Sequence, residues 1–186
     1  MKKKIVALVL VLCVTASLFS AEKRPVAKKS SWAIDGGYSL FDPIFIRSLF
    51  DTGLSGIMSG AQMQVRKTDQ WGHFRMGYPF SIGYYPVDLT APRKGFLMFF
   101  SLAAVPAAVF DLPHSTFDIG LGLKGSGGFT MDDKGAFGPA FSASTILEAG
   151  WRYRLPNQSA LGVRLEAEWS FLLLSFLASA SVEYEF

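Results

Sequence analysis

The chain has 186 residues, a length that fits one domain or two small ones. Half of its residues are hydrophobic and 18% are charged, which argues against intrinsic disorder. Lys2, Lys3 and Lys4 account for the whole formal net charge of +3, so the remainder is neutral and gives no electrostatic basis for binding nucleic acid. The only cysteine, Cys13, lies in the same leader, which excludes disulfides, thiolate metal sites and cysteine catalysis in the rest of the chain.

The first 21 residues have the pattern of a secretory signal peptide. Three lysines precede a continuous apolar run over residues 5–14, which is shorter than the ~20 residues that a retained helical anchor needs. Small residues follow, and cleavage is possible after three of them: Ala16, Ser17 and Ala21. We expect residues 1–21 to be removed, residues 22–31 (EKRPVAKKSS) to form a short basic periplasmic segment, and residues 32–186 to form the folded domain.

Most of this domain alternates between large apolar residues and small or polar ones. Every second residue from Phe74 to Tyr84 is apolar, opposite Arg75, Gly77 and Ser81. A period of two predicts strands. A soluble antiparallel sheet also alternates, but the runs here cover 10–20 residues, whereas soluble strands usually have ~5–6. The run over residues 96–110 is apolar on all sides, and we assign it as a strand from its neighbours.

The pattern predicts an all-β fold, an eight-stranded antiparallel up-and-down transmembrane β-barrel. The expected strands are 31–41, 57–66, 72–85, 95–110, 115–129, 136–155, 160–171 and 175–186. The expected short turns are 67–71, 111–114 and 156–159, and the connections at the other end are 42–56, 86–94, 130–135 and 172–174. A closed barrel is one of two ways to satisfy every backbone polar group in lipid.

The last residue, Phe186, ends an alternating strand in which Val182 and Tyr184 also occupy every second position. This ending resembles the C-terminal signal of bacterial outer-membrane proteins, which the barrel assembly machinery recognises. With the leader and the strands, it resembles the family of small eight-stranded outer-membrane barrels typified by the OmpA transmembrane domain, OmpX and OmpW. The resemblance implies a location in the outer membrane of a diderm bacterium, contact with its lipid, and recognition of Val182, Tyr184 and Phe186 during assembly.

If the large apolar residues face lipid, the residues opposite them face the lumen. In the half near the short turns, which we expect to be periplasmic, these residues are mostly charged. They are Asp35, Arg66, Arg75, Asp118, Glu148, Arg152, Arg154, Arg164, Glu166, Glu168, Glu183 and Glu185. Charges in a narrow interior need partners because desolvation is costly. We expect them to pair into a network that plugs the lower lumen, with a mainly structural role.

The other half of the lumen is expected to be roomier, because small residues dominate it and the strand over residues 95–110 adds apolar side chains. The residues predicted to line a ligand vestibule there are Ser39, Tyr85, Leu97, Phe99, Val105 and Ser142. The first outer loop, residues 42–57, is also rich in apolar residues. It folds over the barrel mouth or lies on the membrane, or else the two flanking strands extend into it, and the sequence leaves these readings open.

Three functions follow from this reading. The first is a barrel that binds or passes a small hydrophobic molecule through the vestibule, as OmpW-like barrels are thought to do. The second is a structural or surface-interaction barrel without transport, of the OmpX and OmpA type. A general porin is disfavoured, because eight strands leave an interior about wide enough for side chains or one small ligand.

The third function is a lipid-modifying enzyme, which would need Ser, His and an acid near the outer leaflet. The two histidines, His73 and His114, are both expected at periplasmic turns, and Ser115 points away from His114 on a strand. Two distant histidines also form no metal cluster. We therefore expect no enzymatic activity, no metal and no cofactor.

Overall fold

The computed structural model describes residues 27–42, 57–88, 94–132, 137–170 and 175–186. The predicted signal peptide and most of the first outer loop, residues 43–56, lie outside the described residues. Among the residues that are described, no helix has the length and apolar character to cross a membrane.

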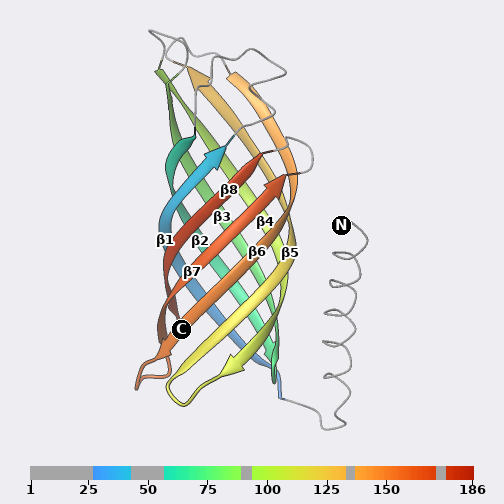
Figure 1. Ribbon diagram of the computed structural model, residues 1–186, viewed down its shortest axis with the longest axis vertical. Coiled ribbons are helices and arrows are strands. Elements are labelled where there is room, and N and C mark those ends of the chain that lie inside the picture. Colours follow the sequence, from blue (N-terminus) through green and yellow to red (C-terminus); the bar gives the residue numbers. More distant parts are fainter. Residues whose placement is uncertain (1–26, 43–56, 89–93, 133–136, 171–174) are drawn as a thin grey trace, which may run out of the picture.

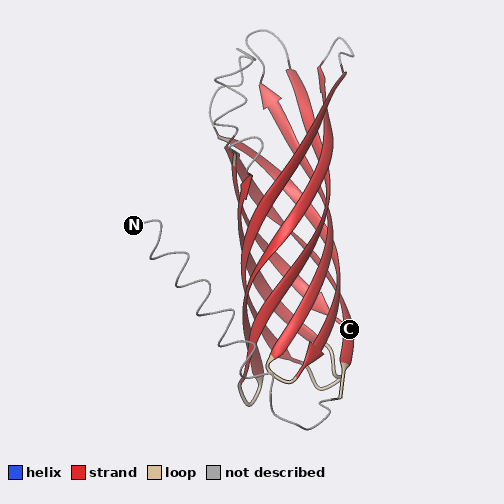
Figure 2. Ribbon diagram, turned by 90° about the vertical axis from the view of Figure 1, so that its right-hand side faces the viewer, coloured by secondary structure: helices blue, strands red, loops and turns tan. Residues whose placement is uncertain are grey.

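Eight strands form one closed antiparallel barrel in which each strand pairs with its sequence neighbours and β1 pairs with β8. The strands are β1 (Lys29–Asp42), β2 (Met58–Trp71), β3 (Phe74–Asp88), β4 (Lys94–Asp111), β5 (Ser115–Asp132), β6 (Phe137–Arg154), β7 (Ala160–Ser170) and β8 (Phe176–Glu185). The strands run obliquely around the barrel axis (Figures 1 and 2). The predicted fold class is confirmed.

The two faces of the barrel have opposite chemistry. Large apolar side chains point outward and are exposed, among them Leu102, Leu123 and Leu165. Arg66, Arg75 and many other charged side chains point inward and are buried. This arrangement inverts that of a soluble protein, and it is the one that hydrocarbon as solvent requires, because backbone and charged groups must then be satisfied inside the barrel.

The predicted turn at residues 67–71 is wrong. Strand β2 continues through these residues to Trp71, which pairs with Phe74, and the turn consists of Gly72 and His73 alone. The polar sequence KTDQW looked like a loop, but it is the end of a strand beyond the apolar belt. Gly72 has a φ of 57°, a backbone conformation that glycine adopts without the steric cost of a Cβ.

Strand β1 begins at Lys29, three residues before the expected start of the barrel, and it pairs with the extended part of β2. Lys28 Nζ lies 3.0 Å from Asp69 Oδ2, and Ser30 Oγ donates a hydrogen bond of 2.7 Å to Asp69 Oδ1. The end of the expected basic segment is therefore held against the barrel through Asp69.

The barrel has two distinct ends. The turn end carries the three short connections at residues 72–73, 112–114 and 155–159, and Phe186 lies there too, joined to Trp32 by two backbone hydrogen bonds of 3.0 and 2.8 Å. At the opposite end, the loop end, the wall is uneven. Strands β4, β5 and β6 have 18 residues each, whereas β7 has 11 and β8 has 10. The longer strands project past the shorter ones (Figures 1 and 2).

The two described turn residues with positive φ allow a matched test of the turn geometry. Gly72→Ala should lower the free energy of unfolding by about 1 kcal/mol, because it places a Cβ in the left-handed region. Gln158 already has a φ of 69°, so Gln158→Gly should leave that free energy unchanged or raise it. Urea titration of the barrel refolded in lipid vesicles measures both, and equal losses from the two substitutions would contradict the assignment.

Candidate functional site: the barrel lumen

A layer of buried ion pairs crosses the lumen in the half near the turn end. Glu148, on β6, is the centre of one group. Its Oε1 accepts a hydrogen bond of 2.9 Å from Arg66 Nη1 on β2. The same oxygen lies 3.2 Å from Arg164 Nη1 on β7 and 3.4 Å from Arg75 Nη2 on β3. All four side chains are fully buried, so one carboxylate ties together three strands besides its own.

Asp118, on β5, is the second centre. Its Oδ1 accepts from Arg75 Nη2 at 2.6 Å and from Arg164 Nη1 at 3.2 Å, and its Oδ2 accepts from Arg152 Nη2 at 2.8 Å. Arg75 and Arg164 therefore bridge Asp118 to Glu148. We call these two carboxylates and the four arginines Arg66, Arg75, Arg152 and Arg164 the charged layer.

Strand β8 joins the charged layer through its two glutamates. Arg164 Nε donates to Glu183 Oε2 at 2.6 Å, and Arg152 contacts both Glu183 and Glu185. Glu183 is buried, whereas Glu185 is half-buried near the turn end. With these glutamates, the layer connects β2, β3, β5, β6, β7 and β8. Removing one partner of an ion pair leaves an uncompensated charge in a desolvated interior.

Asp35, on β1, is different, because it has no ion pair with a lysine or arginine among the described residues. Gln64 Nε2 donates to Asp35 Oδ2 at 3.0 Å and to Glu166 Oε1 at 3.2 Å, so one amide group serves two carboxylates. Glu166 is also 3.2 Å from Arg66 Nη2. Asp35 Oδ1 is buried with no hydrogen-bond partner in the described part of the chain. Within the described part of the chain, the network expected from the sequence therefore leaves Asp35 without an ion-pair partner.

Two further members of the expected network lie outside the charged layer. Arg154 is at the turn end with its side chain 48% exposed, where it contacts Asp111 and donates to Thr116 Oγ1 at 2.9 Å. Its expected luminal position is therefore corrected, because the last residue of β6 lies at the barrel rim. Glu168 lies higher, toward the loop end, and its Oε2 is 2.8 Å from Lys124 Nζ. Lys124 is its partner in place of an arginine.

Inward glycines make room for the long arginines. Arg164 is directly opposite Gly150, and a Cβ at Gly150 would lie 3.1 Å from both Arg164 Nη1 and Nη2. Arg152 is directly opposite Gly162, where a Cβ would lie 2.7 Å from its Cγ. These pairs are a signal that the sequence reasoning missed. The alternation places each glycine on the inner face, but only the strand register shows which arginine lies over it.

The expected vestibule residues separate into two groups. Tyr85, Leu97 and Phe99 come together with Phe41 in an apolar cluster, in which the Phe41 ring lies 5.8 Å from that of Tyr85 and 5.7 Å from that of Phe99. Ser39 adjoins them, since its Oγ donates to the Tyr85 hydroxyl at 2.9 Å. These side chains fill one side of the upper lumen.

The other two expected residues lie outside this apolar cluster. Val105 is fully buried in a separate cluster with Ala103 and Ile146, so it is not part of the vestibule wall. Ser142 is half-buried on β6, and its hydroxyl lies 2.6 Å from that of Ser170.

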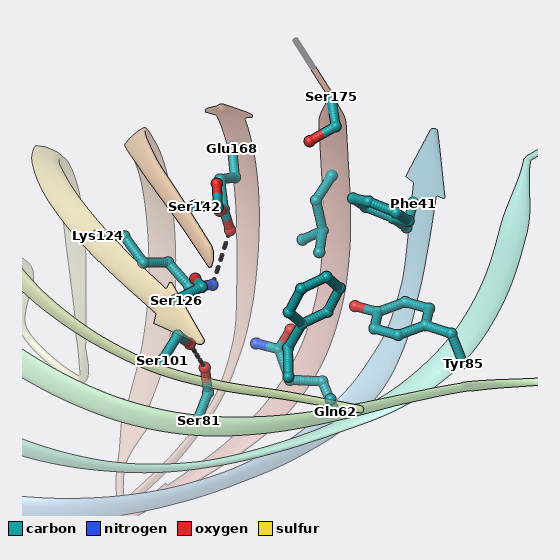
Figure 3. Close-up of a pocket in the computed structure, with 13 residues that line it drawn as sticks. Phe41, Gln62, Ser81, Tyr85, Ser101, Lys124, Ser126, Ser142, Glu168 and Ser175 are labelled. Atoms are coloured by element: carbon teal, nitrogen blue, oxygen red, sulfur yellow. Dashed lines mark hydrogen bonds and ion pairs between the residues drawn. The ribbon is translucent and has the colours of Figure 1, made fainter. Parts of the chain in front are cut away.

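A small cavity lies between the apolar cluster and the Lys124–Glu168 pair, with a volume of about 30 Å³. Figure 3 shows Lys124, Glu168, Ser126 and Ser142 on one side and Phe41 and Tyr85 on the other. The remaining lining residues are Gln62, Ser81, Gly83, Phe99, Ser101, Ser175 and Leu177. A cavity of that size holds one or two water molecules, whereas small-molecule sites measure ~300–1,000 Å³. One wall is apolar and the other is charged and hydroxylated.

The charged layer gives a prediction about which carboxylates stabilise the barrel. Glu183→Gln removes a charge that two arginines share, and we expect it to lower the free energy of unfolding by about 3 kcal/mol. Asp35→Asn removes a charge with no cationic partner among the described residues, so stability should be unchanged or higher. Urea unfolding in lipid vesicles compares the two, and an equal loss from both would contradict the assigned pairing.

The pairs of an inward glycine with an opposite arginine give a second prediction. Gly150→Leu should prevent closure or lower stability by several kcal/mol, because a side chain there meets the Arg164 guanidinium and the Asp118 carboxylate. Gly125→Leu is the matched control, since Gly125 faces outward on β5 and a Cβ there meets nothing within 4 Å. The yield of heat-modifiable barrel on unboiled gels measures closure. Similar yields for the two variants would show that the arginine does not need the glycine.

Comparison with known proteins shows similarity at the level of fold. No protein-family model matches the chain, and no curated protein sequence matches it significantly. Neisserial surface protein A superposes with a TM-score of 0.62 at 11% identity, covering 86% of this chain and 97% of that one. Ail, the attachment invasion locus protein of Yersinia pestis, superposes with a TM-score of 0.55 at 13% identity, covering 86% and 98%, in a complex with the heparin analogue sucrose octasulfate. The chain therefore has the fold of the small eight-stranded outer-membrane β-barrels.

Proposed function

We propose that the protein is a sealed barrel of the bacterial outer membrane that acts as a structural or surface-interaction protein. It is neither a channel nor an enzyme. The observation that carries the proposal is the charged layer, because its four arginines and two carboxylates meet in the lumen as buried ion pairs. The apolar outer face and the fold shared with Neisserial surface protein A and Ail support the membrane location.

The layer resists permeation for energetic reasons. Arg66, Arg75 and Arg164 are each bonded to carboxylates from more than one strand, and none is exposed to solvent. An ion moving past them would have to separate buried pairs, and removing one partner from such a pair costs ~3–5 kcal/mol. An eight-stranded barrel also has little spare interior, since its width is about that of its own side chains.

For a surface-interaction protein, the surface that contacts a partner lies at the loop end of the barrel. The long strands β4, β5 and β6 extend past β7 and β8 there (Figure 1). The structural neighbours are described as a surface protein and an attachment protein, which agrees with such a role without assigning a partner.

Binding of a small hydrophobic molecule is the second candidate. The observation in its favour is the apolar cluster of Phe41, Tyr85 and Phe99 on one wall of the cavity. Phe99 is only partly buried against this cluster. The volume of about 30 Å³ weighs against this candidate, because a hydrophobic ligand would have to displace side chains on entry.

The positions of the histidines support a non-enzymatic protein. His73 lies in the turn between β2 and β3, and His114 lies in the connection between β4 and β5, so both are at the turn end. Neither approaches the Lys124–Glu168 pair that lines the cavity.

Export by the leader of residues 1–21 and recognition by the assembly machinery remain parts of this proposal. Val182, Tyr184 and Phe186 all expose their side chains on the outer face, and the rings of Tyr184 and Phe186 stack at 6.2 Å. An outward row of this kind is accessible to a protein that binds the strand before the barrel closes.

Electrical recording and ligand binding test the two candidates against each other. In planar lipid bilayers the unaltered protein should give no conductance steps, because the charged layer closes the lumen. A stable conductance would overturn the sealed barrel. An apolar naphthylamine dye should show no saturable binding that depends on the lumen.

Two substitutions test whether any dye binding takes place in the lumen. Phe99 faces the lumen, and Phe100 is its neighbour on the outer face of β4. Saturable dye binding that is lost in Phe99→Asp and kept in Phe100→Ala would favour the hydrophobic-ligand candidate. Equal effects of the two substitutions, or no binding at all, support the sealed barrel.

A further inference from the structure

Three residues with hydrogen-bond donors form a row across the outer face of the barrel near the turn end. Lys67 on β2 lies directly opposite Trp32 on β1 and directly opposite Tyr78 on β3. All three side chains point outward and are exposed. Directly opposite residues on one face have Cβ atoms ~4.5–5.5 Å apart, so the Lys67 ammonium has an indole N–H donor on one side and a phenol O–H donor on the other. We call Trp32, Lys67 and Tyr78 the donor row.

Lys67 gives the donor row a positive charge that the protein does not compensate. Lys67 and Asp69 are the two charged residues at outward positions of the described strands in the half near the turn end. Asp69 is buried, because Lys28 Nζ lies 3.0 Å from its Oδ2 and Ser30 Oγ donates to its Oδ1 at 2.7 Å. Within the described part of the chain, Lys67 forms no ion pair of its own. An exposed cation therefore remains on the outer wall, beside a carboxylate that Lys28 already neutralises.

The rows on either side of the donor row mark a change from an apolar to a polar surface. The outward row two residues nearer the loop end is entirely apolar and exposed, and it consists of Ile34, Val65 and Phe80. Two residues nearer the turn end, β1 and β2 carry Ser30 and Asp69. Beyond them Lys28 Nζ lies 5.6 Å from the centre of the Trp71 ring. The donor row thus lies where an apolar wall meets a polar one.

This level on the barrel corresponds to the boundary between hydrocarbon and lipid headgroups. Trp and Tyr are enriched at that boundary, because each has an apolar ring system with one polar group. A lysine there lays its methylene stem along the apolar surface while its ammonium extends to the headgroups. Lys67 has this position, since its stem continues from the exposed side chain of Val65 and its neighbours across the sheet are Trp32 and Tyr78.

We propose that the donor row binds the phosphate of an anionic phospholipid in the leaflet at the turn end. Phosphate offers a negative charge and acceptor oxygens, which match one ammonium and two neutral donors. A lipid fits better than a soluble anion, because the apolar row next to the donors accommodates acyl chains. The turn end of an outer-membrane barrel faces the periplasm, so the lipid is one of the periplasmic leaflet. This inference rests on the proposed membrane location and adds a lipid preference to it.

Quenching of tryptophan fluorescence by brominated lipid measures which headgroup gathers at the donor row. The chain has four tryptophans, and Trp71→Phe, Trp151→Phe and Trp169→Phe leave Trp32 as the single reporter. All three replaced residues are exposed on the outer face, and migration on unboiled gels shows that the reporter protein folds. Every vesicle contains phosphatidylcholine and phosphatidylglycerol in equal amounts, with bromine on the acyl chains of only one of them. The ratio of quenching between the two preparations gives the relative affinity at constant vesicle charge.

Phosphatidylglycerol should have an affinity about five-fold higher than that of phosphatidylcholine, the ratio that ~1 kcal/mol per basic residue near an anionic surface implies. In the reporter protein, Lys67→Gln should bring the affinity ratio close to one, and Lys67→Arg should keep it. Lys29→Gln is the matched control. It removes the same charge from an exposed lysine at the turn end, but from a position of β1 that does not belong to its outward series.

Three results would overturn the inference. They are equal quenching by the two brominated lipids in the reporter protein, an undiminished preference in Lys67→Gln, and an equal loss of preference in Lys67→Gln and Lys29→Gln. The last result would mean that the total charge of the turn end attracts the lipid without a contribution from the donor row. A folded barrel in which neither lipid quenches Trp32 would contradict the proposed membrane location as well, so failure of that location is distinguishable from failure of the lipid preference alone.

Discussion

The structure depends on one constraint, which is that a barrel with an apolar outside must satisfy its charges within its own narrow interior. In the charged layer, each charged group has several partners of opposite charge. Glu148 and Asp118 each contact three arginines, and the arginines in turn contact more than one carboxylate. Each charge is compensated from several directions, so the cost of burial is offset across strands that are far apart in sequence. The same pairs link β2, β3, β5, β6 and β7, and the pair of Arg164 with Glu183 adds β8.

Inward glycines on neighbouring strands provide the space that the arginines of this layer need. Arg164 and Arg152 lie over Gly150 and Gly162, where a Cβ would crowd the Arg164 guanidinium at 3.1 Å and overlap Arg152 Cγ at 2.7 Å. The apolar cluster around Phe41 and Tyr85 then fills one side of the lumen above. The cavity described beside this cluster has a volume of about 30 Å³, and this small size supports the proposed sealed barrel over the hydrophobic-ligand barrel that the sequence analysis placed first.

The sequence by itself determined the fold class, the number of strands and most inward positions, because a period of two is a local property of the chain. It misplaced the turn at residues 67–71, since a polar strand end outside the apolar belt has the composition of a loop. The contacts that each inward side chain makes depended on the tertiary structure. Alternation places Asp35, Arg154 and Val105 on the inner face, but not at a common height. Only strand register and barrel closure decided that Asp35 lacks a described cation, that Arg154 lies at the rim and that Val105 packs apart from Phe99, because neighbours across a closed sheet are fixed by stagger rather than by sequence distance.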